Sequence, residues 1–241
     1  IDDEDYLVLG RGNAYSVEKD AINRVETFCL FFSSEMMNEV AGSLLRRDGH
    51  GLDDPFTPLR FDVYEHRRSH GGPLSRRLLS LRRSYHRGEL TNDLLEEQLL
   101  LLASGIVRQH HAINRTIARL PWERQTTRIE LYRRVHIGRD YIHAHLDEAF
   151  SLEDAARASA LSRYHFLRAF HRIIGQTPLS YLNDLRVTRA KLLLEDPNLS
   201  VTHIGLAVGY SSVAAFSTFF KKSVGVSPLK WRNTARDKQY R

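Results

Sequence analysis

Apolar residues recur with the period of a helix in two stretches near the end of the 241-residue chain. In the first stretch, from Ser162 to Gly175, they occupy positions i, i+3, i+4, i+7 and i+8: Phe166, Ala169, Phe170, Ile173 and Ile174. In the second stretch, from Ser211 to Gly225, the same stripe contains Phe216, Phe219, Phe220 and Val224, with Ser223 at the fourth position. Each stretch therefore predicts an amphipathic helix with a buried apolar face and an exposed polar edge.

The segments around the two predicted helices repeat as well. A short helix is expected before each of them, within Ser151–Leu161 and within Ser200–Tyr210, and Ser151 followed by Asp154 resembles a capping box. After each comes a glycine suited to the left-handed position and then a proline suited to the first turn of a new helix: Gly175, Pro178, Gly225 and Pro228.

The two copies match with a shift inside the turn. Leu161 corresponds to Tyr210, an offset of 49 residues, whereas Phe166 corresponds to Phe216, an offset of 50, so the second turn is one residue longer. The pattern predicts two helix-turn-helix units in tandem, 151–175 and 200–225. Between them, Pro178 to Glu195 predicts a helix of roughly 27 Å, which suits recognition helices that enter major grooves about 34 Å apart.

This part of the chain, Ser151 to Trp231, resembles the DNA-binding domain of AraC/XylS-type transcription regulators. The resemblance rests on the segments SLEDAA, LSRYHFLRAFHRIIGQTPLSYL, IGLAVGYSS and FFKKSVGVSPLKW, and on Arg186, Ala190 and Leu193 between them. It implies a mostly α fold in which a seven-helix C-terminal domain, 128–235, carries both helix-turn-helix units. The second predicted helix differs from the family pattern, which has larger polar residues where this chain has Val213, Ala214, Ala215 and Thr218.

The polar edges of the two predicted helices supply the candidate DNA-binding residues: Arg163, Tyr164, Leu167, Arg168, His171, Arg172, Ser212, Val213, Ala214, Ser217, Thr218, Lys221 and Lys222. Arg163, Tyr164 and Arg168 can donate to base edges, and arginine reads guanine through its O6 and N7 atoms. The cations near the C-terminal end of each helix are better suited to phosphates. Small side chains on the second helix can do little beyond touching thymine methyl groups, so sequence discrimination is expected under the first helix.

The positive charge of the chain is concentrated in the same half. Residues 133–241 contain 17 Lys/Arg against 9 Asp/Glu, a net charge of +8, whereas residues 1–132 contain 18 against 20, a net charge of −2. A basic face of this kind is expected of a polyanion-binding module, and a merely solvated surface is the alternative. A helix from about Arg128 to Leu146 should open the basic half, with an inner face of Ile137, Tyr141, Ile142 and Leu146, after a domain junction in Arg115–Thr127.

The first part of the chain, residues 1–120, is expected to be a small α/β region for sensing or dimerisation. Strands are predicted at Tyr6–Leu9 and at Val25–Phe32, separated by a turn at Gly10–Asn13, and they resemble the tail of a cupin-like sensor half. Two or three strands cannot cover their own edges, so either preceding strands are missing, or these strands pack on the helices or on a second chain. Because residue 1 is Ile rather than Met, we expect a fragment or a processed chain with a truncated N-terminus. A further strand or helix is predicted at Leu59–His66 after a loop at Asp48–Pro58.

Three helices are predicted in this region as well. They begin at Ser34, at Leu74 and at Asn92, and the second is strongly basic and ends at Arg87 before Gly88. The third, residues 92–113, has an apolar face that is wider than one contact requires: Leu94, Leu95, Leu99, Leu100, Leu101, Leu102, Ile106 and Val107. This face fits either the core of the domain, which we favour, or a homodimer interface.

Chemistry other than DNA binding finds little support. His143 and His145 lie two residues apart in a predicted helix and point to different faces, and His66 and His70 lack the acidic partner of a metalloprotease motif, so neither metal nor cofactor is expected. No Gly-rich phosphate loop or nucleophile elbow occurs, so the chain is not expected to be an enzyme. The single Cys29 also argues against the related DNA-alkylation repair proteins, which carry several reactive cysteines.

The sequence thus predicts a cytoplasmic, sequence-specific transcription regulator, an activator, without a membrane span. Its expected partners are double-stranded DNA, RNA polymerase, a small-molecule effector at the N-terminal region and a second copy bound through residues 92–113. The alternative is a basic module that binds DNA non-specifically or binds another protein.

Overall fold

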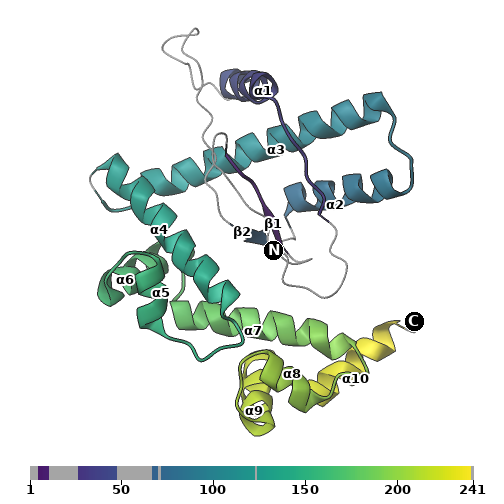
Figure 1. Cartoon of the computed structure of the whole chain (residues 1–241), viewed down its shortest axis with the longest axis vertical. Helices are drawn as coiled ribbons and strands as arrows, with labels where there is room; N and C mark the ends of the chain where they lie inside the picture. The colour runs from purple at the N-terminus through teal and green to yellow at the C-terminus, as the bar shows by residue number, and fades with distance from the viewer. Residues whose placement is uncertain (1–4, 11–26, 48–66, 70–71, 123, 240–241) are drawn as a thin grey trace. The chain divides into compact units, whose positions relative to one another are not determined.

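The computed structural model describes residues 5–10, 27–47, 67–69, 72–122 and 124–239 (Figure 1). The chain divides into two compact modules, which we call the N-terminal module (1–121) and the C-terminal module (122–241). In the described residues no helix is both long and apolar enough to cross a membrane.

The N-terminal module consists of helices packed on one long helix, with a small strand pair. Its elements are β1 (Asp5–Leu7), α1 (Ser34–Arg47), β2 (Arg67–Ser69), α2 (Pro73–His86) and α3 (Asn92–Ala118). Both α1 and α2 pack against α3 (Figure 1). The strands pair antiparallel, with Asp5 opposite Ser69. The three predicted helices are therefore present, and α3 runs beyond its predicted end at Ile113.

The sheet in the residues described differs from the predicted one. The strand predicted at Tyr6–Leu9 is present in part, as β1, but it pairs with β2 rather than with Val25–Phe32. Residues 27–33 form no strand, so the prediction for Val25–Phe32 is wrong over its described part. The run is apolar because alternate side chains contact helices: Phe32 packs against the α1–α3 core and the Phe28 ring lies 6.0 Å from that of Tyr85 in α2. The described part of residues 1–121 thus contains no cupin-like sensor half. The predicted loop 48–58 and element 59–66 lie outside the described residues.

The apolar face of α3 is partly core. Leu102, Ala103, Ile106 and Val107 are buried, and two of them pack with Val40 and Ala41 of α1. Leu100 is 43% exposed. The prediction that this face belongs to the domain core is therefore confirmed for the buried residues, whereas Leu94, Leu95, Leu99 and Leu101 are half-buried and Leu100 is exposed.

The C-terminal module has the architecture that the repeats predict. Its described residues form seven helices: α4 (Gln125–Ala144), α5 (Leu152–Ala158), α6 (Arg163–Ile174), α7 (Pro178–Glu195), α8 (Val201–Ala207), α9 (Val213–Val224) and α10 (Pro228–Gln239). Helices α5 and α6 form the first helix-turn-helix unit, and α8 and α9 form the second, with α7 between them (Figure 1). The offsets of 49 residues from α5 to α8 and 50 from α6 to α9 confirm the longer second turn.

Local signals account for the ends of these helices. Six hydroxyl side chains of this module cap helix N-termini by accepting a backbone N–H three residues on: Ser151, Ser162, Thr177, Ser200, Ser212 and Ser227. Gly175 and Gly225 end α6 and α9 with φ of 89° and 87°, a conformation that favours glycine. The capping box at Ser151 is only half formed, because the Asp154 carboxylate pairs with Arg157 at 2.8 Å.

Each helix-turn-helix unit has its own core. The first core surrounds Phe166 and Phe170, whose rings lie 5.3 Å apart, and contains residues of α4, α5 and the start of α7. The second surrounds Phe216 and Phe220, 5.7 Å apart, and contains residues of α8, α10 and the end of α7. Burial of the two phenylalanine stripes leaves the opposite edges of α6 and α9 in solvent.

The inner face of α4 differs from the prediction. Ile142 is buried and Tyr141 and Leu146 are partly buried in the first core, but Ile137 is 53% exposed. Gly138 takes the inner position instead, because a Cβ there would overlap Ser159 and the ring of Phe166. The helix also begins at Gln125 rather than near Arg128.

Candidate nucleic-acid interface

The polar edge of α6 is fully presented to solvent. Phe166 and Phe170 are completely buried, so the residues on the opposite side of the helix must face outward. All six candidates on α6 are exposed: Arg163, Tyr164, Leu167, Arg168, His171 and Arg172. Tyr164, with 69% of its surface exposed, lies in the first turn of the helix, directly after the four-residue turn 159–162.

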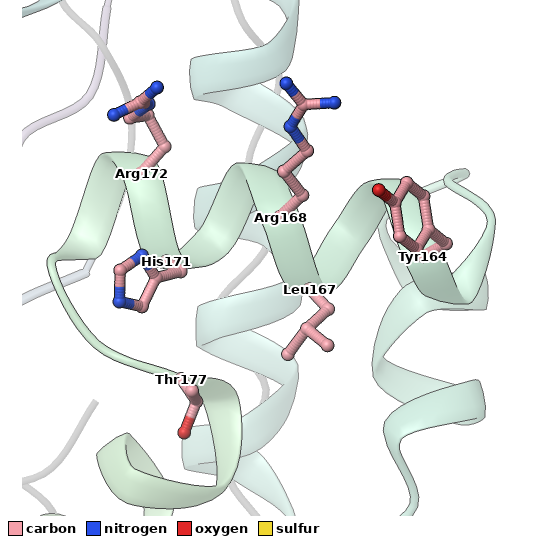
Figure 2. A pocket seen from close by; sticks show the side chains of 6 residues that line it. All are labelled: Tyr164, Leu167, Arg168, His171, Arg172 and Thr177. Atoms are coloured by element: carbon pink, nitrogen blue, oxygen red, sulfur yellow. The ribbon is translucent and has the colours of Figure 1, made fainter.

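These side chains surround a shallow pocket of about 280 Å³ (Figure 2). It is lined by Tyr164, Leu167, Arg168, His171, Arg172 and Thr177. Arg168 and Arg172, one turn apart, extend from the same side of α6, while Leu167 and His171 lie on the side of Thr177 (Figure 2). No carboxylate lines the pocket, so its charged groups suit an anionic ligand.

The corresponding edge of α9 is chemically different. Val213, Ala214, Thr218, Lys221 and Lys222 are exposed, and Ser217 is half-buried. The Ser212 hydroxyl accepts the backbone N–H of Ala215 at 3.2 Å, which leaves its proton free to donate. The first two turns of α9 therefore present methyl groups and single hydroxyls, and its positive charge lies in the last turn.

The electrostatics of the module favour a polyanion. Residues 122–241 contain 19 Lys/Arg against 11 Asp/Glu, a net charge of +8. Among the described residues the ion pairs of this module are Arg134–Glu130, Arg139–Asp140 and Arg157–Asp154, and none of them involves α6 or α9. The cations on the two polar edges thus keep their charge available for a ligand.

The histidines considered as metal ligands contact other groups. His143 Nε2 lies 2.7 Å from the Tyr181 hydroxyl, whereas the His145 ring stacks on Tyr141 with centroids 3.9 Å apart. The two rings therefore have different neighbours, as their spacing on a helix predicts. His66 and His70 lie outside the described residues.

One residue with a special environment was not singled out as functional from the sequence. Arg186, in the middle of α7, is buried, although arginine is rarely so. The available signal was its position on the same helix face as Leu182 and Ala190, four residues away on either side, both of which are buried.

Comparison with known proteins places the similarity in the C-terminal module. Residues 155–234 match the family model described as "Helix-turn-helix domain". The uncharacterised HTH-type transcriptional regulator YdeC of Bacillus subtilis is 37% identical over 93 residues, covering 39% of this chain and 32% of that protein. The HTH-type transcriptional activator RhaS of Escherichia fergusonii is 40% identical over 96 residues, covering 38% and 33%.

Among solved structures, this chain is similar to the DNA-binding domain of AdpA, described as a global transcriptional factor and solved in complex with a target DNA. The identity is 30%, the match covers 44% of this chain and 96% of that one, and the TM-score is 0.42. The chain spans about a third of the length of the curated relatives described above.

Proposed function

We propose that this protein is a transcription regulator that binds duplex DNA sequence-specifically. The match of residues 155–234 to the helix-turn-helix domain model, and the similarity to HTH-type transcriptional regulators, support the proposal. The C-terminal module acts as the DNA-binding domain, with 151–175 and 200–225 as its two DNA-reading units. The observation that carries the proposal is the edge of α6, where Arg163, Tyr164 and Arg168 are exposed directly after a tight turn.

Base reading is assigned to the first turns of α6. A helix-turn-helix unit inserts the N-terminal part of its second helix into the major groove, and Arg163, Tyr164 and Arg168 occupy that part of α6. Arginine donates two parallel hydrogen bonds to guanine, which no other base accepts in the same pattern. Ser212, which caps α9, and the residues of α9 up to Thr218 add contacts that discriminate less between bases.

Phosphate contacts are assigned to the last turns of both helices. His171 and Arg172 of α6 and Lys221 and Lys222 of α9 are exposed there. Phosphate contacts fix the position and register of a protein on DNA without reading the bases. Both helices then occupy successive major grooves on one face of the duplex, joined by α7.

A second candidate function is non-specific binding of DNA or of an acidic protein. The short, uncharged side chains at the start of α9 favour it, because Val213 and Ala214 offer no hydrogen-bond donor to a base. The two functions differ in sequence preference rather than in charge, since both use the net charge of +8.

Competition binding with the full-length chain distinguishes sequence-specific from non-specific binding. Selection from random duplexes supplies a preferred operator, and the affinity for it is then compared with the affinity for random DNA at one salt concentration. A specific regulator binds its operator at least about a thousandfold more tightly than it binds random DNA. The Arg163→Ala/Arg168→Ala double variant should abolish most of that gap, whereas Arg115→Ala, an exposed control in α3, should not. Equal affinity of the unaltered protein for all duplexes would leave only the non-specific function.

Residues 1–120, which lie in the N-terminal module, are proposed to sense a small-molecule effector and to form a homodimer through residues 92–113. Leu100, exposed on α3, supports the dimer. We further propose that the protein is an activator that contacts RNA polymerase, in keeping with the name of RhaS, a transcriptional activator.

A further inference from the structure

Arg186 is buried, with 7% of its surface exposed, in the helix that joins the two helix-turn-helix units. Its neighbours on the same face of α7, Leu182 and Ala190, are almost completely buried and apolar. A charge in such a place is stable only if hydrogen-bond partners surround it. The partners of Arg186 therefore indicate what this residue does.

Those partners come from the loop before the first helix-turn-helix unit and from the turn inside the second unit. Arg186 Nε donates to the carbonyl oxygen of Leu146 at 2.9 Å, and Nη2 donates to that of Glu148 at 2.6 Å. Both carbonyls lie in the loop that leads from α4 into α5 of the first unit. On its other side the guanidinium Cζ lies 5.3 Å from the ring centroid of Tyr210, in the turn between α8 and α9 of the second unit.

Tyr210 responds to this environment in the expected direction. Burial raises the pKa of the Tyr210 phenol, and the nearby positive charge and hydrogen bond of Arg186 oppose that rise. The raised pKa keeps the phenol neutral at physiological pH, and its ring serves as a cation–π partner of the guanidinium.

Gly209, the residue before Tyr210, has no side chain, and the Arg186 guanidinium occupies the space that a side chain would need. Gly209 has φ of +82°, and a Cβ there would overlap Arg186 Nη2, lie 2.9 Å from its Cζ and 3.0 Å from the carbonyl carbon of Asp147. The corresponding residue of the first turn is Ala160, with φ of 51°. Alanine thus occupies the left-handed region in the first turn, but φ at Gly209 is 31° larger (82° − 51°), where a side chain would be strained as well as crowded. The absent side chain provides the space in which the second turn packs against the loop of the first unit.

We propose that Arg186 and Gly209 are positioning residues that lock the two helix-turn-helix units in one relative orientation. This inference rests on the proposed function, because the fixed orientation would allow α6 and α9 to bind one face of the same duplex together. Directional hydrogen bonds from a charged donor resist rotation of one unit about α7. Arg232 provides a contrast, because it donates to Leu194 and Leu199 within the second half.

The orientation can be measured without DNA. Spin labels attached through His165→Cys in α6 and Ser223→Cys in α9, both exposed positions, report the distance between the recognition helices in the full-length chain, once the exposed Cys29 is replaced by Ser. The unaltered protein should give one narrow distance distribution. Arg186→Met, which keeps most of the buried volume and removes the donors, should broaden or shift it.

Matched variants control for charge and for turn conformation. Gly209→Ala should have the same effect as Arg186→Met, because it fills the space of the guanidinium. Arg189→Met, on an exposed face of α7, and Ala160→Gly, in the equivalent turn, should keep the narrow distribution. If Arg186→Met does not fold, Arg186→Lys keeps the charge but loses the forked donor geometry and serves the same purpose.

DNA-binding measurements then distinguish the hypothesis of a fixed orientation, which we call the lock, from the proposed function. Arg186→Met and Gly209→Ala should lower affinity for the selected operator by about tenfold and weaken its preference for the native spacing between half-sites, because simultaneous binding is lost. Binding to a duplex that carries the α6 half-site alone should be unchanged. Unaltered distance distributions in both variants would overturn the lock, whatever the DNA results. A broadened distribution together with no sequence preference in the unaltered protein would uphold the lock and reject the proposed function.

Discussion

Replacing Arg168 with alanine should remove sequence discrimination without affecting the fold. The side chain is exposed on α6 and takes no part in the first core, so we expect a change in unfolding free energy of no more than about 0.5 kcal/mol. Loss of a bidentate contact to guanine costs about 1–3 kcal/mol, which corresponds to about 5- to 150-fold in affinity for the preferred operator. Random DNA, which lacks that contact in most registers, should lose much less.

The same structure predicts smaller and different effects in α9. Thr218→Ala removes one hydroxyl from an exposed position. Because an ordinary hydrogen bond contributes only about 0.5–1.5 kcal/mol, the loss of binding free energy should not exceed that range. Lys221→Ala removes a charge in the last turn, so it should weaken operator and random DNA by similar factors and reduce the salt dependence by about one phosphate contact.

The assay is equilibrium binding of each variant to a panel of operators that differ from the preferred one at single positions. Arg168→Ala should flatten the preference at one or two neighbouring positions, while Lys221→Ala should leave the preference profile unchanged. If Arg168→Ala keeps the full profile and Thr218→Ala or Val213→Ala erases part of it, the assignment of base reading to α6 is reversed.

Three other predictions follow from the two modules. The 122–241 fragment, which contains both cores, should bind operator DNA as a monomer with steep salt dependence and a footprint on successive turns; a footprint of one turn would contradict this. Leu100→Lys should lower the mass seen in light scattering if the α3 face mediates dimerisation, whereas Leu102→Lys, at a buried position, should lower the melting temperature. Gly138→Ala should reduce the unfolding free energy by about 1–3 kcal/mol in urea titrations, because its Cβ would overlap Phe166.

The helices of the C-terminal module could be predicted from sequence because their signals are local. The stripe containing Phe166 and Phe170 determines which residues face solvent, and serine caps and Gly175 mark where α6 begins and ends. The exposure of Arg163, Tyr164 and Arg168 follows from the same stripe. Candidate site residues on a short amphipathic helix are therefore accessible to sequence reasoning, whereas their DNA contacts are not.

Elements whose environment depends on distant neighbours were predicted less well. Residues 27–32 have strand propensity, but the alternate side chains pack on helices, and propensity cannot supply a strand partner. On α4, Ile137 is exposed because Gly138 allows Phe166 to approach that side of the helix. Likewise, the choice between Leu100 and Leu102 as the exposed residue of α3 depends on which sides of α3 the neighbouring elements cover.

Arg186 shows the difference most clearly. By itself the sequence determines that it lies on α7, four residues from Leu182 and from Ala190, on the face that should be apolar. Only the tertiary structure decides that carbonyl oxygens 40 and 38 positions earlier in the chain accept its hydrogen bonds, and that Gly209 leaves space for it. The physical reason is that a buried charge is stabilised by acceptors brought together by folding, and sequence patterns extend over only a few helical turns.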